Sequence, residues 1–430
     1  MITHFNRENY VSAALRRLNA GILCDPTFKD RVEVIVVDNS KSLEITEDFR
    51  VTHIVNENYG GSGGFARGLM YLEQAGSFTH CLFMDDDASC EVESIKRCYA
   101  LLSYAKSERF AIAGALLNEI ESYRLIEKGA KFGPSCRSLK AGLDVRAVGD
   151  LLLSEKIDEF VDYGAWWFFA FSLRDVNHYP FPFFVRGDDI TFGFMNGFNI
   201  LTMNGISVWG DDFAAKSGPV QCYLDTRYHT LVNLIILKTK FRKIAALVRR
   251  TFFAQLYSYN YSSASAICLA LEHICRGPDF FERNLNLSDT IREINSHVTK
   301  EKMHPIARAD FDFAQIKHKR FNFLKRAYQS ISLNGALGFR SRSSARSILL
   351  PKRFAGDKNA AFHAHTIVYE YEPLKLGYVA RLDRKIMFVE IIKFLRVYIY
   401  FVIYFFSLKK SYKSRFDHFT SRTFWEDVYK

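Results

Sequence analysis

The chain has 430 residues with 48% hydrophobic and 24% charged side chains, a composition that fits a globular protein and excludes an intrinsically disordered one. This length favours two domains over one small core. The formal net charge of +11 indicates a polyanionic partner. Because no nucleic-acid-reading motif is present, we expect no nucleic acid and favour a membrane surface.

Short apolar runs alternate with helix-like segments in the first half, which is the pattern of an α/β domain. We predict strands over residues 32–37, 51–55, 80–84 and 111–117, and helices over 8–19 and 65–74. Polar side chains follow several of these strands. In open parallel sheets this edge binds ligands, so we expect the functional site there.

The pattern becomes helical after about residue 214, with predicted helices over 223–238, 243–257 and 263–276. Much of the basic excess lies here, for example at Lys238, Arg340 and Arg342. A C-terminal apolar stretch keeps an uncharged run only over 397–408, which is shorter than the ~20 residues of a membrane span. We expect this stretch either to lie in the headgroup region of a membrane or to pack on the first domain.

The eight cysteines are scattered without zinc-site spacing, which fits free thiols in a reducing compartment. The first residues do not have the pattern of a signal peptide. Together with the basic helical half, these features predict a cytoplasmic protein that is peripheral at the inner face of the cell membrane.

Three adjacent aspartates, Asp85, Asp86 and Asp87, directly follow the predicted strand 80–84. Their carboxylates repel one another, so a bound cation is the expected reason for such a run. Oxygen ligands of this kind suit Mn²⁺ or Mg²⁺ together with a substrate phosphate. Because side chains alternate along a strand, Asp85 and Asp87 are predicted to face the cation. The alternative is a solvated acidic turn.

A glycine-rich segment over residues 56–68 lies between two predicted strands and leads into a helix. Glycines allow a ligand to approach the backbone, and a helix N-terminus favours phosphate. The segment matches neither the P-loop nor the dinucleotide-binding pattern. We expect it to hold a phosphate-bearing ligand through Asn58, Gly60, Gly61, Gly63, Gly64 and Arg67.

Two further motifs carry aromatic rings and carboxylates. The adjacent Trp166 and Trp167 are equally suited to stacking on a sugar ring and to filling a core. Asp188 and Asp189 follow an apolar run, and either carboxylate can serve as a general base. His229 is a candidate metal ligand, although a lone histidine is more often structural.

In this order, the motifs resemble those of the family-2 glycosyltransferases, and within them the bacterial galactofuranosyltransferases that build galactan chains. The resemblance covers about residues 3–235, from Thr3-His-Phe-Asn-Arg7 to Val208-Trp209. It implies a GT-A (Rossmann-like) nucleotide-sugar-binding domain over residues 1–235. It also implies a mostly helical domain over residues 236–430 that supports oligomerisation or membrane docking.

The resemblance also implies roles for individual residues. Thr3, Arg7 and Asp38 would contact a nucleoside-diphosphate sugar donor, and we expect Asp86, the remaining aspartate of the run, to contact it as well. Asp85 and Asp87 would hold Mn²⁺ or Mg²⁺, Asp189 would be the base of an inverting transfer, and Trp166 and Trp167 would line the acceptor site. These enzymes carry a histidine metal ligand directly after the Val-Trp pair. This chain has Gly210 there, so we expect either that Asp211, Asp212 or His229 takes its place or that the metal is held more loosely.

The expected activity is transfer of galactofuranose from UDP-galactofuranose to a polysaccharide or lipid-linked glycan acceptor in cell-surface glycan synthesis, such as that of O-antigen. Rhamnosyl, glucosyl and galactosyl transfer are alternatives. A nucleotidyltransferase and a non-catalytic carbohydrate-binding protein are the rivals from other classes. The expected partners are the donor, the acceptor, a membrane surface and further copies of the chain in a homo-oligomer.

Overall fold

The computed structural model describes residues 1–45, 50–211, 213, 217–237, 239–308, 311, 313, 321–337 and 347–430. Of the residues named above, Asp212, Lys238, Arg340 and Arg342 lie outside these ranges.

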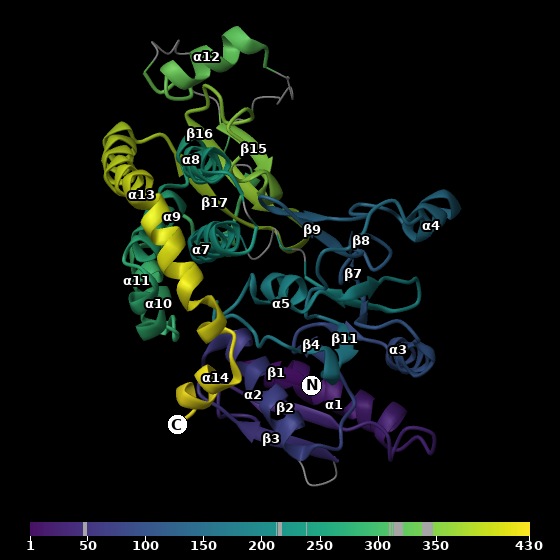
Figure 1. Cartoon of the computed structure of the whole chain (residues 1–430). Helices are drawn as coiled ribbons and strands as arrows, with labels where there is room; N and C mark the ends of the chain where they lie inside the picture. The colour runs from purple at the N-terminus through teal and green to yellow at the C-terminus, as the bar shows by residue number, and fades with distance from the viewer. Residues whose placement is uncertain are drawn as a thin grey trace.

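A seven-stranded sheet in the order β12-β6-β11-β4-β1-β2-β3 forms the centre of the N-terminal half (Figure 1). Its strands are β1 (Ile2–His4), β2 (Val34–Asp38), β3 (Val51–Val55), β4 (His80–Asp85), β6 (Phe110–Ala113), β11 (Phe169–Ser172) and β12 (Asn199–Leu201). β1 lies between β2 and β4 in parallel register, with Thr3 beside both Val37 and Asp85. The carboxyl ends of these three strands therefore meet at one edge of the sheet. β11 runs antiparallel to both β4 and β6.

Helices cover both faces of this sheet. They are α1 (Glu8–Leu18), α2 (Gly60–Ala75) and α3 (Val92–Tyr104). Alternate residues of β2 point to opposite faces, and all five are buried. Ile35 and Val37 pack in the core that contains Phe65 and Leu69 of α2, while Val34 and Val36 pack in the core that contains α1. Burial on both faces explains the uninterrupted apolar run over residues 34–37 within the predicted strand.

The predicted strand 111–117 is wrong in one respect, because Gly114 divides it. β6 ends before this glycine, and β7 (Ala115–Asn118) begins after it. A side chain at Gly114 would lie 2.8 Å from Cβ of Phe168, so the chain passes too closely here to continue one straight strand. β7 joins a second sheet in the order β5-β13-β7-β8. The other strands of this sheet are β5 (Ser89–Cys90), β8 (Leu125–Glu127) and β13 (Ser207–Gly210).

Smaller elements surround the two sheets. A hairpin consists of β9 (Ala130–Phe132) and β10 (Cys136–Ser138), and two short helices are α4 (Val148–Glu155) and α5 (Asp188–Asn196). α5 begins directly after Gly187, whose φ of 88° is in the left-handed region.

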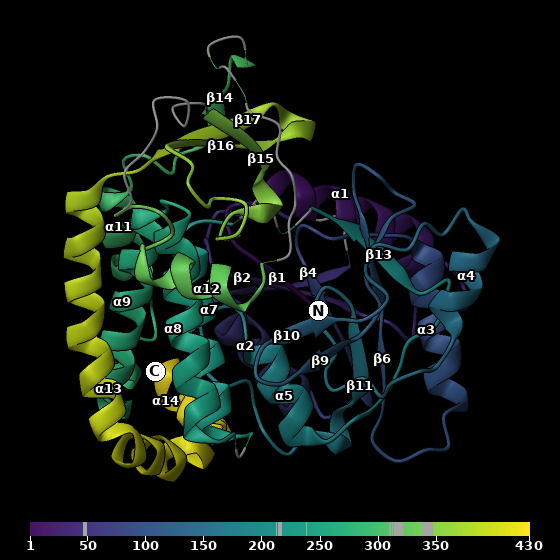
Figure 2. The ribbon, with the colours of Figure 1, turned by 90° about the horizontal axis from the view of Figure 1, so that it is seen from above.

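The second half is mainly helical, so the predicted α/β domain followed by a helical region is confirmed. Its helices are α7 (Pro219–Ile235), α8 (Phe241–Tyr257), α9 (Tyr261–Cys275), α10 (Pro278–Arg283), α11 (Ser288–His297), α12 (Phe323–Ile331), α13 (Arg384–Phe419) and α14 (Arg422–Val428). Figure 2 shows α13 along the outer edge of this layer, beside α9. No helix within the described ranges has both the length and the hydropathy needed to cross a membrane.

A four-stranded sheet in the order β14-β17-β16-β15 adjoins the helices and is absent from our prediction. Its strands are β14 (His304–Pro305), β15 (Ser347–Pro351), β16 (Thr366–Tyr371) and β17 (Leu376–Arg381). Every residue of β16 is buried, and the hydroxyl of Tyr369 donates to the carbonyl of Ser258 at 3.2 Å. The sheet is thereby fixed to the segment that joins α8 and α9.

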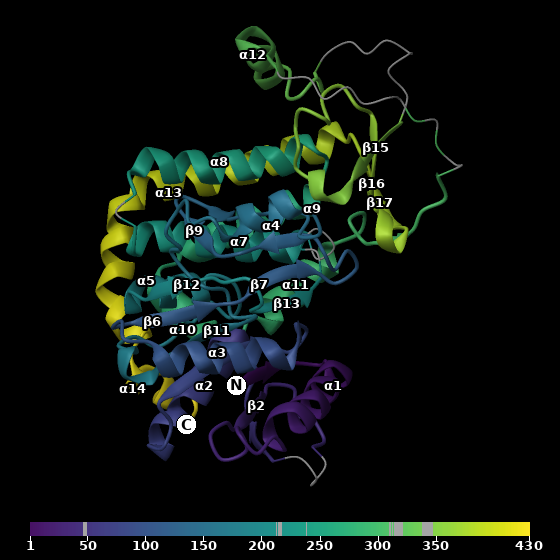
Figure 3. The same cartoon turned by 90° about the vertical axis from the view of Figure 1, so that its right-hand side faces the viewer.

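The last helix, α14, returns to the N-terminal half and lies against α2 (Figures 1 and 3). Trp425 Nε1 donates to the carbonyl of Pro180 at 3.0 Å, and the Tyr429 hydroxyl donates to the carbonyl of Gly63. The guanidinium of Arg67 lies over the ring of Tyr429, 5.1 Å from its centroid. The C-terminal residues of the chain therefore contact and stabilise the glycine-rich start of α2.

Candidate active site

An acidic cluster lies at the carboxyl edge of the central sheet, where β4 ends. Arg7 follows β1, the neighbouring strand, and its side chain reaches two of the three aspartates. Nη1 lies 2.6 Å from Oδ1 of Asp86, and Nη2 lies 3.2 Å from Oδ2 of Asp87. Asp86 also accepts the amide of Phe5 at 3.1 Å. Burial opposes its ionisation, but the nearby His4 ring and the hydrogen-bonded Arg7 guanidinium hold the pKa of Asp86 below its usual value.

The pKa of Asp85 is shifted in the opposite direction. Burial, followed by the charges of Asp87, Asp86 and Asp188, raises its pKa to about 8, against the opposing effect of Arg7. The cluster therefore holds more negative charge than one guanidinium compensates. Hard oxygen donors with uncompensated charge fit a divalent cation such as Mn²⁺ or Mg²⁺.

The predicted metal trio of Asp85, Asp87 and His229 is not formed in this structure. Across the described ranges, no group of three or more His, Cys, Asp or Glu side chains is arranged to hold a metal ion. Gly210, at the end of β13, supplies no ligand, and His229 Nε2 accepts the amide of Cys136 at 3.4 Å. A cation held by one or two carboxylates would complete its coordination with phosphate oxygens and water.

Asp188 and Asp189 open α5 and lie close to the acidic cluster. Oδ2 of Asp188 accepts the hydroxyl of Ser62, from the first turn of α2, at 2.8 Å. Burial raises the pKa of Asp188 to about 6. Burial and then the charge of Asp188 raise the pKa of Asp189 well above its usual value, and Asp85 contributes to this effect. The structure thus places the carboxylates of both motifs within electrostatic reach of one another.

The glycines of α2 are explained by close packing inside the protein. A Cβ at Gly60 would lie 2.0 Å from the carbonyl oxygen of Phe184, one at Gly63 would lie 2.4 Å from Tyr59, and one at Gly64 would lie 2.2 Å from Thr3. Only at Gly61, among these four, does the position remain clear, with Asp188 Oδ2 at 3.7 Å. The amide of Ser62 is already used by the carbonyl of Phe184 at 3.1 Å. Gly60 therefore allows α2 to approach the loop before Asp188, and Gly64 allows it to approach β1.

Other residues predicted to bind the donor accept hydrogen bonds from nearby backbone amides in this structure. Asp38 accepts the amides of Ser40, Lys41 and Leu43 at 2.9–3.0 Å. Burial opposes ionisation of Asp38, but these bonds hold its pKa below the usual value. Asn58 Oδ1 accepts the amide of Gly60 at 3.1 Å.

Arg67 and Thr3 are the two other donor-binding candidates. The Arg67 guanidinium faces Tyr429 at the other side of α2. The buried hydroxyl of Thr3 has no hydrogen-bond partner within the described ranges.

The tryptophan pair is divided between the core and the surface. Trp166 is buried against Phe65, Phe83 and Phe192, with ring centroids 4.9–5.6 Å away. Trp167 is half-buried, and its Nε1 donates to the carbonyl of Gly114 at 2.9 Å. Of the two rings, Trp167 is the one with surface left for a sugar.

Sequence reasoning missed Glu127, at the end of β8. This carboxylate is buried and accepts the hydroxyl of Ser138. Burial raises its pKa to about 7, and its charge contributes to the raised pKa of Asp189. A carboxylate that ends a short apolar run was its only signal in the sequence.

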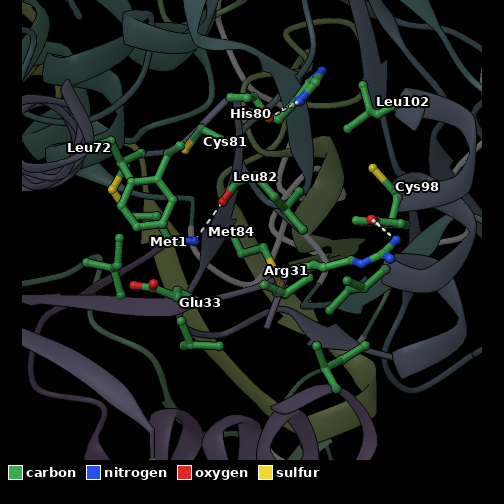
Figure 4. A pocket seen from close by; sticks show the side chains of 18 of the residues that line it. Met1, Arg31, Glu33, Leu72, His80, Cys81, Leu82, Met84, Cys98 and Leu102 are labelled. Carbon is green, nitrogen blue, oxygen red and sulfur yellow. Dashed lines mark hydrogen bonds between the residues drawn. The ribbon is translucent and has the colours of Figure 1, made fainter. Parts of the chain in front are cut away.

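A cavity of about 420 Å³ lies at the opposite end of the central strands (Figure 4). Ile2 is in register with Val36 and Met84, so the earlier residues of β2 and β4 extend past the start of β1. The cavity fills the space between them and is lined by apolar side chains together with Arg31, Glu33 and His80. It contains none of the aspartates of the candidate site.

Comparisons with known proteins point to one family. Residues 1–116 match the family described as glycosyl transferase family 2. The galactofuranosyltransferase GlfT2 of Mycobacterium tuberculosis is 26% identical over 315 residues, which are 65% of this chain and 48% of the relative. The protein of the same name from Mycolicibacterium smegmatis is 26% identical over 247 residues, which are 52% of this chain and 37% of the relative. The chain thus spans less than half the length of these relatives.

A crystal structure of residues 1–349 of S. aureus TarS aligns over 71% of this chain and 93% of its own, with 14% identity and a TM-score of 0.35. The family match and the curated relatives confirm the predicted resemblance of this chain to the family-2 glycosyltransferases and, within them, to bacterial galactofuranosyltransferases.

Proposed function

We propose that the chain is an inverting glycosyltransferase that moves a hexose, with UDP-galactofuranose as the leading donor, onto a hydroxyl of a glycan or lipid-linked glycan. The observation that carries the proposal is the convergence of Asp85–Asp87 and Asp188–Asp189 at the sheet edge that also presents Arg7. The names of the two curated relatives support the choice of sugar.

Each group at this edge suits one task of such a reaction. Arg7 is a fixed cation beside the cluster, positioned to pair with a diphosphate oxygen. Asp85 and Asp87 would hold Mn²⁺ or Mg²⁺, which would neutralise charge on the departing nucleotide when bound. Burial would exclude water from the attack on the anomeric carbon.

Asp189 is the proposed base. Its raised pKa makes the ionised carboxylate a strong proton acceptor. It would take the proton of the attacking hydroxyl, while Asp188, held by Ser62, would fix the start of α5. Attack on the face opposite the departing phosphate then gives inversion. The half-buried ring of Trp167 is the proposed acceptor platform.

Nucleotide release with and without an acceptor sugar tests this proposal. We would compare UDP-galactofuranose, UDP-galactose, UDP-glucose and dTDP-rhamnose, each with and without Mn²⁺. Asp189→Asn should lower turnover by about 10²–10⁴-fold while leaving the donor-induced thermal shift intact. Asp289→Asn, at an exposed position on α11, is the matched control and should be neutral. Undiminished transfer by Asp189→Asn would remove the base assignment, and a wild type inert with every donor would remove the activity.

A further inference from the structure

The buried face of α13 includes one carboxylate in an otherwise apolar row. The apolar members recur at helical spacing and include Met387, Phe394, Phe401 and Phe405. Glu390 lies three residues after Met387 and four residues before Phe394, so it belongs to the same row, and it is only 5% exposed. A buried charge destabilises the fold unless partners compensate for its lost hydration. The partners of Glu390 therefore determine whether this position is purely structural.

One of the two Glu390 oxygens has a partner and the other has none among the residues that the structure describes. Oε1 accepts Nζ of Lys393, which follows on the same helix, at 2.7 Å. Oε2 is buried and has no hydrogen-bond partner. A buried charged acceptor without a donor costs more free energy than an ordinary hydrogen bond contributes. Oε2 is therefore a position to which a bound molecule can donate.

Glu390 lines a cavity of about 430 Å³ between α9, α11 and the start of α13. Small-molecule sites have volumes of about 300–1,000 Å³. A single water molecule, with ~30 Å³, could bond to Oε2 but would leave most of this space unexplained. Figure 2 shows these three helices on the side of the helical layer that is remote from the central sheet. The lining includes no residue of the candidate active site, so the cavity is a separate feature.

The charged side chains that line the cavity have both signs. They are Glu293, Glu301 and Glu390 together with Lys300 and Lys393. An anionic ligand would be repelled by the carboxylates, and a cationic ligand would be repelled by the ammonium groups. A neutral ligand that both donates and accepts hydrogen bonds can use the two kinds of group at once. The charge pattern therefore favours a neutral polar molecule.

Glu301 lines the same cavity, but both of its oxygens are already bonded. Oε1 accepts the amide of Ser262 at 2.6 Å, and Oε2 accepts the hydroxyl of Ser263 at 2.5 Å. Burial raises the pKa of Glu301 against these bonds. Glu301 thus fixes the start of α9 as one wall of the cavity, whereas Glu390 keeps an oxygen for a ligand.

Hydroxyl groups and apolar side chains complete the lining. Ser265 and Thr299 provide hydroxyls, and Leu269, Ile294 and Ile386 provide apolar surface. A sugar ring matches this combination. Its hydroxyls donate to carboxylates and accept from ammonium or hydroxyl groups, while its C–H faces pack on apolar side chains.

We propose that this cavity binds a neutral sugar, with Glu390 Oε2 accepting one of its hydroxyl groups. Lys393 holds the carboxylate through Oε1, so Oε2 has a fixed position for the incoming hydroxyl. The bound sugar supplies the hydrogen bond that the buried oxygen lacks. This inference does not depend on the proposed transfer reaction, because the cavity contains none of its residues and binding requires neither donor nor metal.

Saturation-transfer difference NMR on the full chain, without nucleotide sugar or metal, tests the proposal. The probes are galactose and glucose, each compared with its amino sugar and its uronate, which differ from it in charge. We expect at least one neutral sugar to bind, and to bind at least about fivefold more tightly than both of its charged relatives. Tighter binding of an amino sugar or a uronate would overturn the assignment of a neutral ligand.

Two variants locate the bound sugar. Glu390→Gln keeps the size of the side chain, and Lys393 would hold its amide oxygen, so an amide nitrogen that cannot accept replaces Oε2. Sugar binding should weaken by about tenfold or more, because a hydrogen bond to a charged acceptor is lost. Ser265→Leu should abolish binding by filling the cavity from α9. Glu272→Gln, at another ion-paired glutamate on α9 but outside the lining, is the matched control and should be neutral.

Thermal melting of each variant, measured in parallel, identifies any loss of binding that results from unfolding. Because the two variants lie on different helices, a folded one still decides the question if the other unfolds. Sugar binding that a folded Glu390→Gln or Ser265→Leu variant retains in full would place the sugar elsewhere and overturn the proposal. The absence of binding by both neutral sugars would also overturn it and would leave the cavity to water.

Discussion

Gly60 and Gly76 provide a matched test of the packing between α2 and the loop before Asp188. Both have positive φ, 69° and 66°, so alanine at either position costs about 1–2 kcal/mol of backbone strain. A Cβ at Gly76 would have nothing within 4 Å, whereas one at Gly60 would lie 2.0 Å from the carbonyl oxygen of Phe184. Backbone atoms cannot rotate away, so Gly60→Ala carries an additional overpacking cost of about 1–3 kcal/mol.

We therefore expect Gly60→Ala to lower the free energy of unfolding by about 2–5 kcal/mol and Gly76→Ala by about 1–2 kcal/mol. Urea unfolding followed by tryptophan fluorescence measures both. Phe184 lies four residues before Asp188, so the displaced loop should also reduce nucleotide release by Gly60→Ala, but not by Gly76→Ala. Equal losses of stability and unchanged activity in the two variants would refute this account of the glycine-rich segment.

Three further predictions concern single side chains. Burial raises the pKa of Glu127 from 4.5 to about 7, so the folded state binds this proton more tightly and its stabilising effect is lost as the pH rises between these values. Urea unfolding measures the effect: as the pH rises from about 5 to 8, the free energy of unfolding of Glu127→Gln should increase by about 2–3 kcal/mol relative to that of the wild type. Glu108→Gln, at an exposed position, is the control and should show no such increase. Arg7→Ala removes the cation beside Asp86 and Asp87, and calorimetry should show Mn²⁺ binding tightened by about fivefold; unchanged affinity would contradict competition between the two cations. Tyr429→Phe removes the hydrogen bond to Gly63 and should cost about 1 kcal/mol in unfolding free energy; a neutral effect would show that ring packing alone holds α14.

The local sequence patterns predicted the central strands well because the burial of these strands in the folded protein matches their apolar sequences. The run before Asp38 is buried on both faces and contains only apolar residues until the strand ends. Gly114 broke a predicted strand for a reason that lies elsewhere in the chain, at Phe168. The C-terminal sheet was missed because its strands lie in the half of the chain whose pattern we interpreted as helical.

The candidate site was predicted in part for the same physical reason. Asp85 and Asp87 follow directly from the end of β4, and the sheet register brings Arg7 beside them. The different surroundings of Trp166 and Trp167 could not be predicted, because adjacent side chains in a sequence carry no sign of which one faces the core. Glu127 comes from another sheet, and no spacing in the sequence connects it to Asp189.

The contact between α14 and α2 has a consequence for how the chain folds. Tyr429 and Gly63 are 366 residues apart, yet they share a hydrogen bond at the start of the glycine helix. Contacts of such separation form late, because the entropy of closing the intervening loop must be met first. The pairings within the central sheet, such as those of β2 with β3 and of β1 with β4, close much shorter loops. The start of α2 gains its contact with the C-terminal segment only when residues 422–430 have docked. Folding intermediates should therefore contain the sheet before α14 has docked on α2.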